Sequence, residues 1–375
     1  MLTTAAVLRF MGTPGPYATS RPLSIETVRL DPPGEGEVLV EVAAAGLCHS
    51  DLSVIEGVRP RPLPMLLGHE ASGVVVSIGP GVRSVAAGDH VVCTFVPSCG
   101  HCLPCATGRP ALCEPGAQAN AAGTLLSGVR RIRTDDGPLH HHLGVSGFAR
   151  HAVLSERSVV RIDPDVPLRE AALFGCAVLT GVGAVMNTAR IEPGMSAAIF
   201  GLGGVGLSAV MGAVASGAHP VIAVDVVEAK LDLARQMGAT HVVHAAQDDP
   251  VHAIRELTGG GAQHVVETVG SERVLVQAYQ ATRRGGTTTT VGLPAPDRAF
   301  SIPAVSLVAE ERTVKGSYMG STVPSRDIPR FIALWEAGRL PVERLLTGTL
   351  ALQDINAGFD ALAAGQAVRQ LVTFE

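Results

Sequence analysis

The feature that most constrains this chain is a glycine-rich turn, Gly201-Leu-Gly-Gly-Val-Gly206, between an apolar segment and a helical one. It directly follows the predicted strand 196–200 and opens the predicted helix 204–216. Asp225 ends the next predicted strand, 19 residues beyond Gly206. A G-x-G-x-x-G pattern alone is a weak signal that also fits a plain buried turn. This strand–turn–helix context, with an acidic residue at that distance, is typical of a dinucleotide site.

The three glycines of the G-x-G-x-x-G pattern each have a physical role in that interpretation. Gly201 allows the tight turn, Gly203 lets a pyrophosphate approach the backbone, and Gly206 lets the helix pack on the strand. The unpaired N–H groups at the helix start would bind the phosphates. Asp225 is expected to bind the ribose 2′-hydroxyl and to repel a 2′-phosphate, which favours NAD over NADP.

From about residue 178 the sequence alternates between apolar strands and helices. The predicted strands are 196–200, 221–224, 241–244, 265–269 and 287–291, and the predicted helices are 204–216, 228–237, 251–257 and 274–282. Such alternation implies right-handed crossovers and a parallel sheet covered on both faces. The predicted fold class is therefore α/β, with a doubly wound nucleotide-binding domain over residues 178–320.

The remaining sequence reads as short strands separated by Gly/Pro turns. Strands are predicted at 27–30, 37–43, 71–78, 90–94 and 152–154, and the tail adds helices at 327–337 and 355–363 and a strand at 369–374. Because the tail strand can return to the first domain, residues 1–177 and 321–375 are assigned to one discontinuous, mainly β domain. Two domains suit 375 residues, since single cores stop growing near about 250–300 residues.

Four of the seven cysteines form a compact group. Cys99, Cys102, Cys105 and Cys113 follow the spacing C-x2-C-x2-C-x7-C. Buried or disulfide-bonded cysteines are the alternative, but the x2 spacing favours metal chelation. Four thiolates close a tetrahedron around Zn²⁺ and leave no place for substrate, so this zinc is predicted to be structural and to contribute folding energy.

Two further cysteines follow a different logic. Cys48 and Cys176 stand 128 positions apart with His69 between them, and Cys48 and His69 each lie in a loop after an apolar stretch. Two thiolates and one imidazole leave the fourth zinc position open for water or an alcohol. Taken singly, a loop histidine is more often a surface residue. Cys93 lies inside a predicted strand and is interpreted as a buried, inert thiol.

Charge and hydropathy exclude other classes. A formal net charge of −5 and a pI near 6.2 give no basic face for nucleic acid. The charge-free run 196–224 has the apolar character of a membrane span, but its glycines and His219-Pro220 break it into short elements. The amino terminus lacks the basic region of a secretory signal, so the zinc thiolates indicate a reducing, cytoplasmic location.

Together these stretches resemble the zinc-dependent alcohol dehydrogenases of the medium-chain dehydrogenase/reductase superfamily, close to the liver-type and glutathione-dependent formaldehyde dehydrogenase branch. The resemblance runs from about Thr27 to the end of the chain. It rests on Gly-Leu-Cys48-His-Ser-Asp51, Gly68-His69-Glu70, the four-cysteine group, Gly175-Cys176, the glycine turn and Val368-Arg369. It implies a GroES-like first domain, two zinc ions per subunit, NAD, and interconversion of alcohol and aldehyde.

The resemblance also implies residue roles. Cys48, His69 and Cys176 would bind catalytic zinc, which lowers the pKa of an alcohol hydroxyl. Asp51 would orient His69, Glu70 would lie behind the metal, and Ser50 would begin proton removal towards the nicotinamide ribose. The cofactor-binding set would comprise Gly201, Gly203, Gly204, Val205, Gly206, Asp225, Lys230, Arg369, His49 and Thr180.

The same resemblance places five residues in the substrate pocket, namely Phe95, His142, Leu143, Leu293 and Tyr318. A plain core or surface role is the alternative for each. The triplet His140-His141-His142 is not expected to bind metal, since relatives carry His-His-aromatic there without one. The pocket weakly favours a medium-chain or aromatic primary alcohol. A homodimer is expected, formed through the sheet edge of the nucleotide domain.

Three departures from the family pattern bear on function. Ser53 stands where the proton relay often ends in histidine, and His49 replaces a pyrophosphate-binding arginine, which should speed NAD release. Ala117 and Arg59 stand where the glutathione-using branch carries an arginine and an acid. A thiol-adduct-dependent formaldehyde dehydrogenase is therefore disfavoured and remains the alternative. A non-enzymatic NAD(H) sensor should lack a zinc ligand, whereas all three are present.

Overall fold

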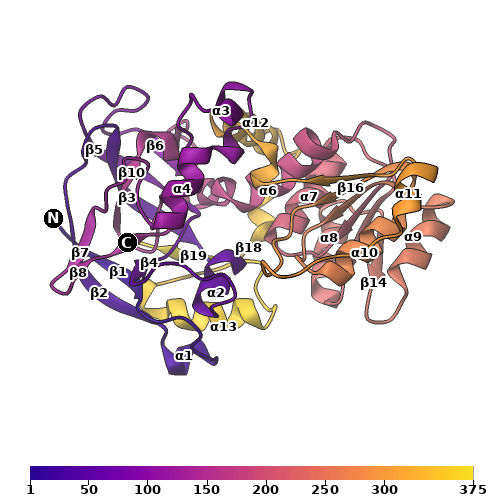
Figure 1. The fold of residues 1–375 in the computed structure, drawn as a ribbon, viewed down its shortest axis with the longest axis horizontal. Helices are drawn as coiled ribbons and strands as arrows, with labels where there is room; N and C mark the ends of the chain where they lie inside the picture. Colours follow the sequence, from indigo (N-terminus) through magenta and orange to yellow (C-terminus); the bar gives the residue numbers. More distant parts are fainter. Residues whose placement is uncertain (375) are drawn as a thin grey trace. The chain divides into compact units, whose positions relative to one another are not determined.

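The computed structural model describes residues 1–374, which form two compact units (Figure 1). The first unit contains Met1–Cys176, Val323–Pro329 and the chain from Leu346 onward. The second contains Ala177–Thr322 and Arg330–Leu345. Each unit is built around its own sheets.

The second unit is a doubly wound sheet in which every neighbouring pair of strands is parallel. The strand order is β14-β13-β12-β15-β16-β17. The strands are β12 (Ala197–Phe200), β13 (Val221–Asp225), β14 (His241–His244), β15 (Ala262–Glu267), β16 (Thr282–Thr290) and β17 (Thr313–Gly316). The order reverses between β12 and β15, which is where open α/β sheets bind their ligands. The predicted fold class is confirmed.

Helices connect these strands and cover the sheet. They are α6 (Ala177–Gly183), α7 (Gly204–Ala215), α8 (Glu228–Gln236), α9 (Pro250–Thr258), α10 (Glu272–Ala281) and α11 (Ala304–Ala309). Ile254 of α9 and Ala278 of α10 share a buried cluster with Phe200 and Val224. Because side chains alternate across a strand, one sheet face is packed against α9 and α10.

The ends of these elements follow from local chemistry. Asp249 accepts hydrogen bonds from the N–H groups of Val251 and His252 and so caps α9, while Gly259 ends it in the left-handed conformation. The predicted strand 265–269 ends earlier, at Glu267. The Glu267 carboxylate accepts the Val269 and Gly270 N–H groups at 2.7 Å and turns the chain there. The short polar strand β17 was not predicted, since its pattern gives little apolar signal.

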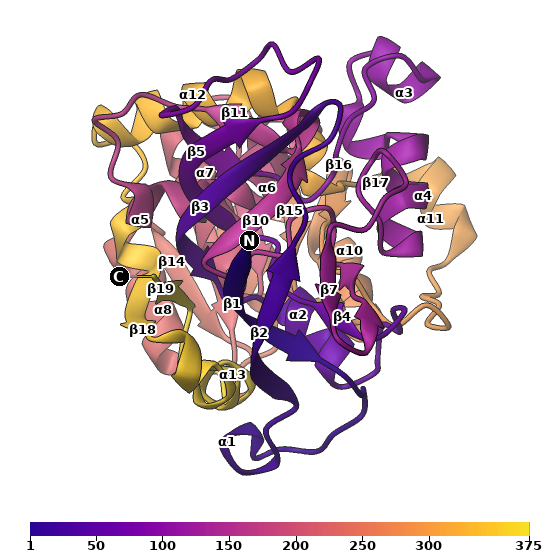
Figure 2. The same cartoon turned by 90° about the vertical axis from the view of Figure 1, so that its left-hand side faces the viewer.

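The first unit contains two mainly antiparallel sheets (Figure 2). One contains β1 (Leu2–Leu8), β2 (Leu23–Leu30), β4 (Met65–Leu66), β7 (Ile132–Thr134), β8 (Gly137–Pro138) and β9 (His140–His141). The other contains β3 (Glu37–Gly46), β5 (Ala71–Ile78), β6 (His90–Cys93), β10 (His151–Ser155), β11 (Val159–Arg161), β18 (Leu346–Leu350) and β19 (Arg369–Thr373). The tail returns to this unit because β19 pairs with β3. Strand β1 was not predicted.

Short helices lie on the connections of the first unit. They are α1 (Tyr17–Ser20), α2 (His49–Ile55), α3 (Leu103–Ala106), α4 (Glu114–Ala122), α5 (Leu168–Ala172) and α13 (Ile355–Ala363). The longer α12 (Pro324–Glu336) has residues in both units. No single helix in residues 1–374 is long and apolar enough to cross a membrane. One bent pair, Leu168–Gly175 with Ala177–Ala189, passes that test by length and composition only.

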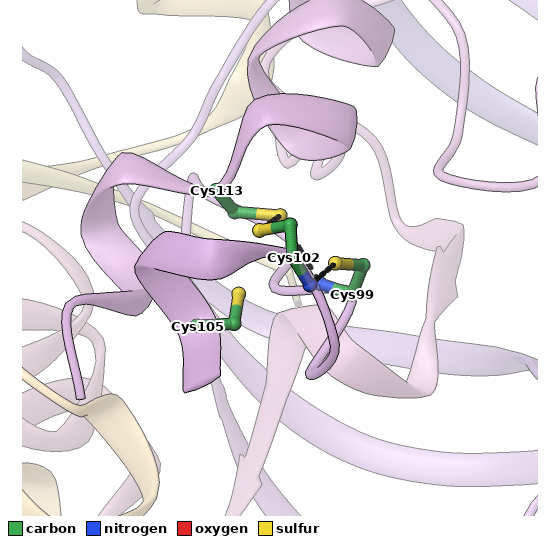
Figure 3. Close-up of side chains that lie close together, drawn as sticks. All are labelled: Cys99, Cys102, Cys105 and Cys113. Atoms are coloured by element: carbon green, nitrogen blue, oxygen red, sulfur yellow. Dashed lines mark hydrogen bonds between the residues drawn. The ribbon is translucent and has the colours of Figure 1, made fainter. Parts of the chain in front are cut away.

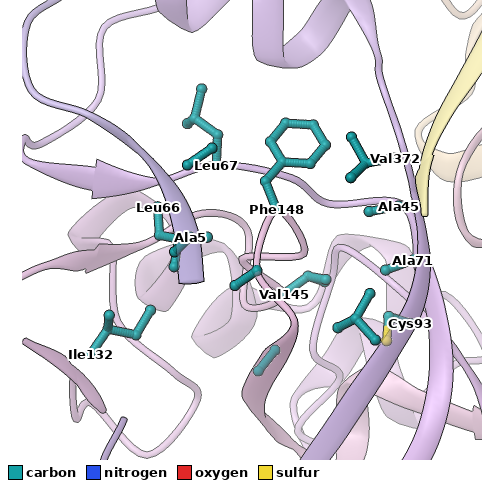
Figure 4. Close-up of a cluster of buried hydrophobic side chains, with 14 of the residues drawn as sticks. Ala5, Ala45, Leu66, Leu67, Ala71, Cys93, Ile132, Val145, Phe148 and Val372 are labelled. Atoms are coloured by element: carbon teal, nitrogen blue, oxygen red, sulfur yellow. The ribbon is translucent and has the colours of Figure 1, made fainter. Parts of the chain in front are cut away.

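A continuous apolar core lies between the strands of the first unit. Figure 4 shows Phe148 and Cys93 among its alanine, leucine and valine side chains. Phe148 meets Phe359 of α13 edge to face, with ring centroids 6.1 Å apart. Cys93 is 1% exposed, and burial raises the pKa of its thiol to about 12. Cys93 is therefore a buried core side chain, as predicted.

Candidate active site

The first metal-type site is the cysteine lobe, which we define as Cys99, Cys102, Cys105 and Cys113. Their four sulfur atoms all lie within 4.8 Å of one another. Figure 3 shows the side chains gathered around α3, and Figure 2 shows that α3 stands apart from the sheets of its unit.

Backbone N–H groups point at the sulfurs of the lobe. The Cys113 sulfur accepts from Cys99 N at 3.2 Å and from Gly116 N at 3.4 Å, and the Cys99 sulfur accepts from Cys102 N at 3.3 Å. All seven cysteines of the chain are free thiols, so the disulfide alternative is wrong. Four preorganised sulfurs with N–H donors suit a closed zinc site.

The second site is the open cluster, which we define as Cys48, His69 and Cys176. Cys48 precedes α2 as its N-cap, His69 follows β4, and Cys176 directly precedes α6. One ligand atom from each lies within 4.8 Å of the others, and the three residues are 1–6% exposed. Residues far apart in sequence therefore meet in one buried place with three ligands of the zinc-binding type.

Glycines make room for this arrangement. A Cβ on Gly46 would lie 2.8 Å from Glu70 Oε1, and a Cβ on Gly68 would lie 2.5 Å from the Phe148 backbone nitrogen. Gly68 also has a φ of +91°, a conformation that other residues rarely adopt. Small residues beside Cys48 and His69 are thus required by close approach.

The electrostatics of the open cluster favour a cation. A hydrogen bond from Cys176 and the positive charges of Arg369 and His69 lower the pKa of Cys48 well below its usual range. The hydrogen bond to Cys48 raises the pKa of Cys176, which keeps the shared proton. Burial opposes protonation of His69, but Asp51 and Cys48 raise its pKa well above its usual range. A bound Zn²⁺ would replace these protons as the positive charge.

Glu70 and Arg369 lie beside the open cluster. Glu70 is 0% exposed, neither of its carboxylate oxygens has a hydrogen-bond partner, and burial raises its pKa to about 7. Arg369 Nε lies 3.8 Å from Glu70 Oε1, and Arg369 Nη1 donates to the Leu47 carbonyl at 3.0 Å. Arg369 is 2% exposed and influences the Cys48 thiol. Arg369 therefore lies next to Glu70 and the open cluster. Sequence reasoning did not predict this contact.

Asp51 supports the imidazole of His69. Asp51 is buried, and its carboxylate lies 3.1 Å from Nδ1 of His69 and accepts the Gly68 N–H at 3.1 Å. Burial opposes ionisation of Asp51, but the neighbouring His69 and His142 lower its pKa. The orientation of the His69 ring is thereby fixed by a carboxylate at Nδ1.

The predicted proton-relay residues lie on α2. His49 is exposed and Ser50 half-buried, which leaves both accessible. Ser53 Oγ donates to the His49 carbonyl at 2.7 Å, so its hydroxyl proton is used inside the helix.

The predicted pocket residues fall into both units. Phe95 and His142 each meet the His69 ring edge to face, with centroids 5.7 and 5.5 Å away. Leu143 is 7% exposed and has a φ of +52°. Leu293 and Tyr318 belong to the second unit and are 50% and 37% exposed. His140 is half-buried, and the His141 ring accepts the Arg131 N–H at 3.1 Å.

The glycine turn sits at the switch point of the parallel sheet. Gly201 has a φ of +86°, and a Cβ on Gly206 would collide with the Gly201 carbonyl. A Cβ on Gly203 would meet no heavy atom within 4 Å, which leaves an open cradle at the N-terminus of α7. This geometry fits a dinucleotide pyrophosphate.

The other predicted cofactor residues surround that turn within the second unit. Asp225 ends β13 and accepts the Leu202 N–H at 2.6 Å and the Val226 and Val227 N–H groups. Gly204 and Val205 form the first turn of α7, Lys230 lies on α8, and Thr180 is buried on α6. Thr268 was not predicted, and its hydroxyl donates to the Gly201 carbonyl at 2.9 Å. One unit thus carries zinc-type sites and the other a dinucleotide cradle, a combination that defines a metal- and nucleotide-dependent oxidoreductase.

Comparisons with known proteins agree with this class. The family model for the alcohol dehydrogenase GroES-like domain matches residues 34–164, and the zinc-binding dehydrogenase model matches residues 204–337. The chain is 38% identical over 385 aligned residues to the NDMA-dependent alcohol dehydrogenase of Amycolatopsis methanolica, with 99% of each chain covered.

Solved structures give the same result. An alcohol dehydrogenase zinc-binding domain protein from Burkholderia ambifaria is 39% identical, with a TM-score of 0.94 over 100% of this chain and 99% of that one. Benzyl alcohol dehydrogenase from Acinetobacter calcoaceticus is 34% identical, with a TM-score of 0.93 over 100% of both chains. The chain therefore belongs to the zinc-dependent alcohol dehydrogenases of the medium-chain dehydrogenase/reductase superfamily. It is an oxidoreductase of alcohols and aldehydes that uses zinc and a nicotinamide cofactor.

Proposed function

We propose that this protein oxidises primary alcohols of medium chain length or aromatic character to aldehydes with NAD, and catalyses the reverse reaction. The observation that carries the proposal is the open cluster of Cys48, His69 and Cys176, buried beside a Glu70 carboxylate that has no hydrogen-bond partner. The first unit would carry the zinc chemistry and the second unit the nucleotide. The relative from Acinetobacter calcoaceticus, named as a benzyl alcohol dehydrogenase, supports an aromatic substrate.

The position of each residue in the site indicates its proposed role. When bound, zinc supplies a Lewis acid that lowers the pKa of an alcohol hydroxyl, and NAD supplies a hydride acceptor. Cys48, His69 and Cys176 would hold the metal, and Asp51 orients His69. The half-buried Ser50 hydroxyl would take part in moving the substrate proton outwards. Since Ser53 donates to its own helix, we assign the next proton step to water or His49.

The substrate proposal is tested by following NADH formation over primary, secondary, aromatic and polar alcohols, with and without glutathione. Efficient oxidation of benzyl or medium-chain primary alcohols without any thiol is expected. Activity that appears only with formaldehyde and glutathione would instead support the thiol-adduct-dependent formaldehyde dehydrogenase.

The preference for NAD rests on Asp225 at the end of β13. Its carboxylate would accept hydrogen bonds from the ribose hydroxyls and would repel a 2′-phosphate. Asp225→Ala should therefore shift the ratio of efficiencies with NAD⁺ and NADP⁺ towards NADP⁺ by about 10-fold or more, the equivalent of about 1.4 kcal/mol. An unchanged ratio would contradict the assignment of Asp225 to the ribose.

A second candidate concerns the electron acceptor. The relative from Amycolatopsis methanolica, which matches along 99% of both chains, is named NDMA-dependent. Assays with NAD⁺ alone and with added NDMA separate the two candidates. Sustained NADH formation on NAD⁺ alone supports the first, and turnover that requires NDMA supports the second.

We also propose a homodimer and a reducing, cytoplasmic setting, the latter supported by seven free thiols. Strand β17 ends the sheet of the second unit, and the neighbouring α11 exposes 71% of Val305 and 80% of Val308. Such apolar exposure is typical of an interface. Light scattering should give twice the 38.6 kDa chain mass, and Val308→Asp should shift it towards the monomer.

A further inference from the structure

The buried Asp51 carboxylate lies between two imidazole rings, and only one of them belongs to the open cluster. Nδ1 of His69 and Nδ1 of His142 each lie 3.1 Å from an Asp51 oxygen. The Gly68 N–H donates to Asp51 Oδ1 at 3.1 Å, as does the His69 ring, whereas the His142 contact has the distance but not the angle of a hydrogen bond. Asp51 and both histidines are 0–1% exposed.

The backbone holds His142 at this place. Strand β9 pairs in parallel with β4, so His142 leaves one strand as Leu67 leaves the other, two residues before His69. The His142 N–H donates to Ser146 Oγ at 3.0 Å, and its carbonyl accepts the N–H of Ser146. Ser146 and Leu143 both have positive φ values, +55° and +52°. A tight, conformationally costly turn therefore fixes the ring.

Hydrogen-bond chemistry then fixes the tautomer of both rings. An ionised carboxylate only accepts hydrogen bonds, so each imidazole must present an N–H at Nδ1 to Asp51. For His69 this leaves Nε2 with its lone pair free for a metal, on the side of the Cys48 thiol. The second imidazole brings Nδ1 to 3.1 Å from Asp51 Oδ1, a contact at ion-pair distance whose angle falls outside hydrogen-bond range.

We propose that His142 is a positioning residue of the zinc site, which holds the Asp51 carboxylate in line with Nδ1 of the zinc ligand His69. This inference rests on the proposed function, because it requires metal on Cys48, His69 and Cys176. Without the His142 ring nitrogen 3.1 Å away, the Asp51 carboxylate can rotate, and the hydrogen bond that orients His69 loosens. Partners that orient a ligand in this way typically change metal affinity about 10–100-fold.

Three substitutions separate the hydrogen bond from the ring. His142→Phe keeps a planar ring but removes the donor. His142→Asn places an amide N–H near the position of Nδ1, whereas His142→Gln places it near the position of Nε2. Phe95→Leu is the matched control, because it removes the other ring packed on His69 and leaves the donors of Asp51 intact.

The measurement is the rate of zinc transfer from the folded protein to a chromophoric chelator, with Cys48→Ala identifying the kinetic phase of the open cluster. We expect His142→Phe and His142→Gln to release that zinc about 10–100-fold faster than the native protein. His142→Asn and Phe95→Leu should stay within about 3-fold of native. In cobalt-substituted protein, the visible ligand-field bands should shift for Phe and Gln and return towards native for Asn.

Native release rates in His142→Phe, or equal rates for the Asn and Gln variants, would overturn the role of His142. If His142→Phe does not fold, the comparison between Asn and Gln still decides the question. If native protein and Cys48→Ala contain the same zinc per subunit, the proposed function itself fails, which is a different result from native-like His142 variants.

Discussion

The cysteine lobe and the open cluster are both cysteine-containing sites of one unit, yet they are built in opposite ways. The lobe takes its four cysteines from 15 consecutive residues, and three of the four are half-exposed. The open cluster takes its three residues from positions 48 to 176, and all three are buried. Local spacing is enough to assemble the first site, whereas the sheets of the unit must form before the second exists.

The groups that surround the two sites also differ. The lobe sulfurs accept hydrogen bonds from backbone N–H groups, which are fixed dipoles. The open cluster is flanked by ionisable side chains, including Asp51, Glu70 and Arg369. Four cysteines supported by backbone N–H groups suit a structural zinc site. Three protein ligands among charged side chains leave a fourth coordination position for substrate and suit a catalytic zinc site. Four substitutions test this contrast.

The largest effect is expected from Cys48→Ala in the open cluster. Loss of the Lewis acid should lower kcat/KM by about 10³-fold or more, since about 4 kcal/mol of transition-state stabilisation would be lost. Zinc per subunit should fall from two to one, with NAD binding and the melting temperature nearly unchanged. Elemental analysis and steady-state kinetics measure this. Full activity in a variant that lacks zinc at this site would refute the catalytic assignment.

Cys105→Ala in the lobe should show the opposite pattern. Loss of a structural metal should lower the free energy of unfolding by roughly 4 kcal/mol, because the short helix α3 has little apolar core of its own. Activity per folded molecule at low temperature should persist. Thermal unfolding and kinetics at 15 °C, chosen as a temperature well below a typical midpoint, check this. Unchanged stability would show that the lobe contributes no folding energy.

Asp51→Asn asks whether the open cluster depends on its charged support. The amide keeps the size of the side chain but no longer offers two anionic acceptors to His69 and His142. Zinc affinity of the open cluster should fall about 10–100-fold, with the lobe zinc retained. Competition with a chelator of known affinity provides the measurement, and equal affinities in native and variant protein would argue against the orienting role.

The smallest effect on stability and activity is expected from Cys93→Ala, which serves as the control for both sites. This thiol is 1% exposed in the apolar core and holds no ligand position. Its removal should cost about 1 kcal/mol of stability and change neither zinc content nor kcat/KM. Denaturant unfolding and elemental analysis check both expectations. A loss of zinc would mean that the seventh cysteine belongs to a metal site after all.

Sequence reasoning succeeded where a signal is local or periodic. The strand 71–78, the glycine turn and the spacing of the cysteine lobe are all readable within a few residues, and the doubly wound sheet follows from alternation. It missed β1, β17, β18 and several two- or three-residue strands of the first unit, and it misplaced the end of β15. In the last case the Glu267 carboxylate turns the chain through the Val269 and Gly270 N–H groups, a contact that periodicity does not encode.

By itself the sequence determined the fold class, the four-cysteine lobe and the three separate residues that meet in the open cluster, because spacing and residue chemistry constrain these directly. Only the tertiary structure decided that Arg369 lies against Glu70 and that His142 shares Asp51 with His69. These contacts join segments of the first unit that are far apart in sequence. They depend on strand pairing and on burial, which excludes water and leaves charged groups to interact with one another inside the protein.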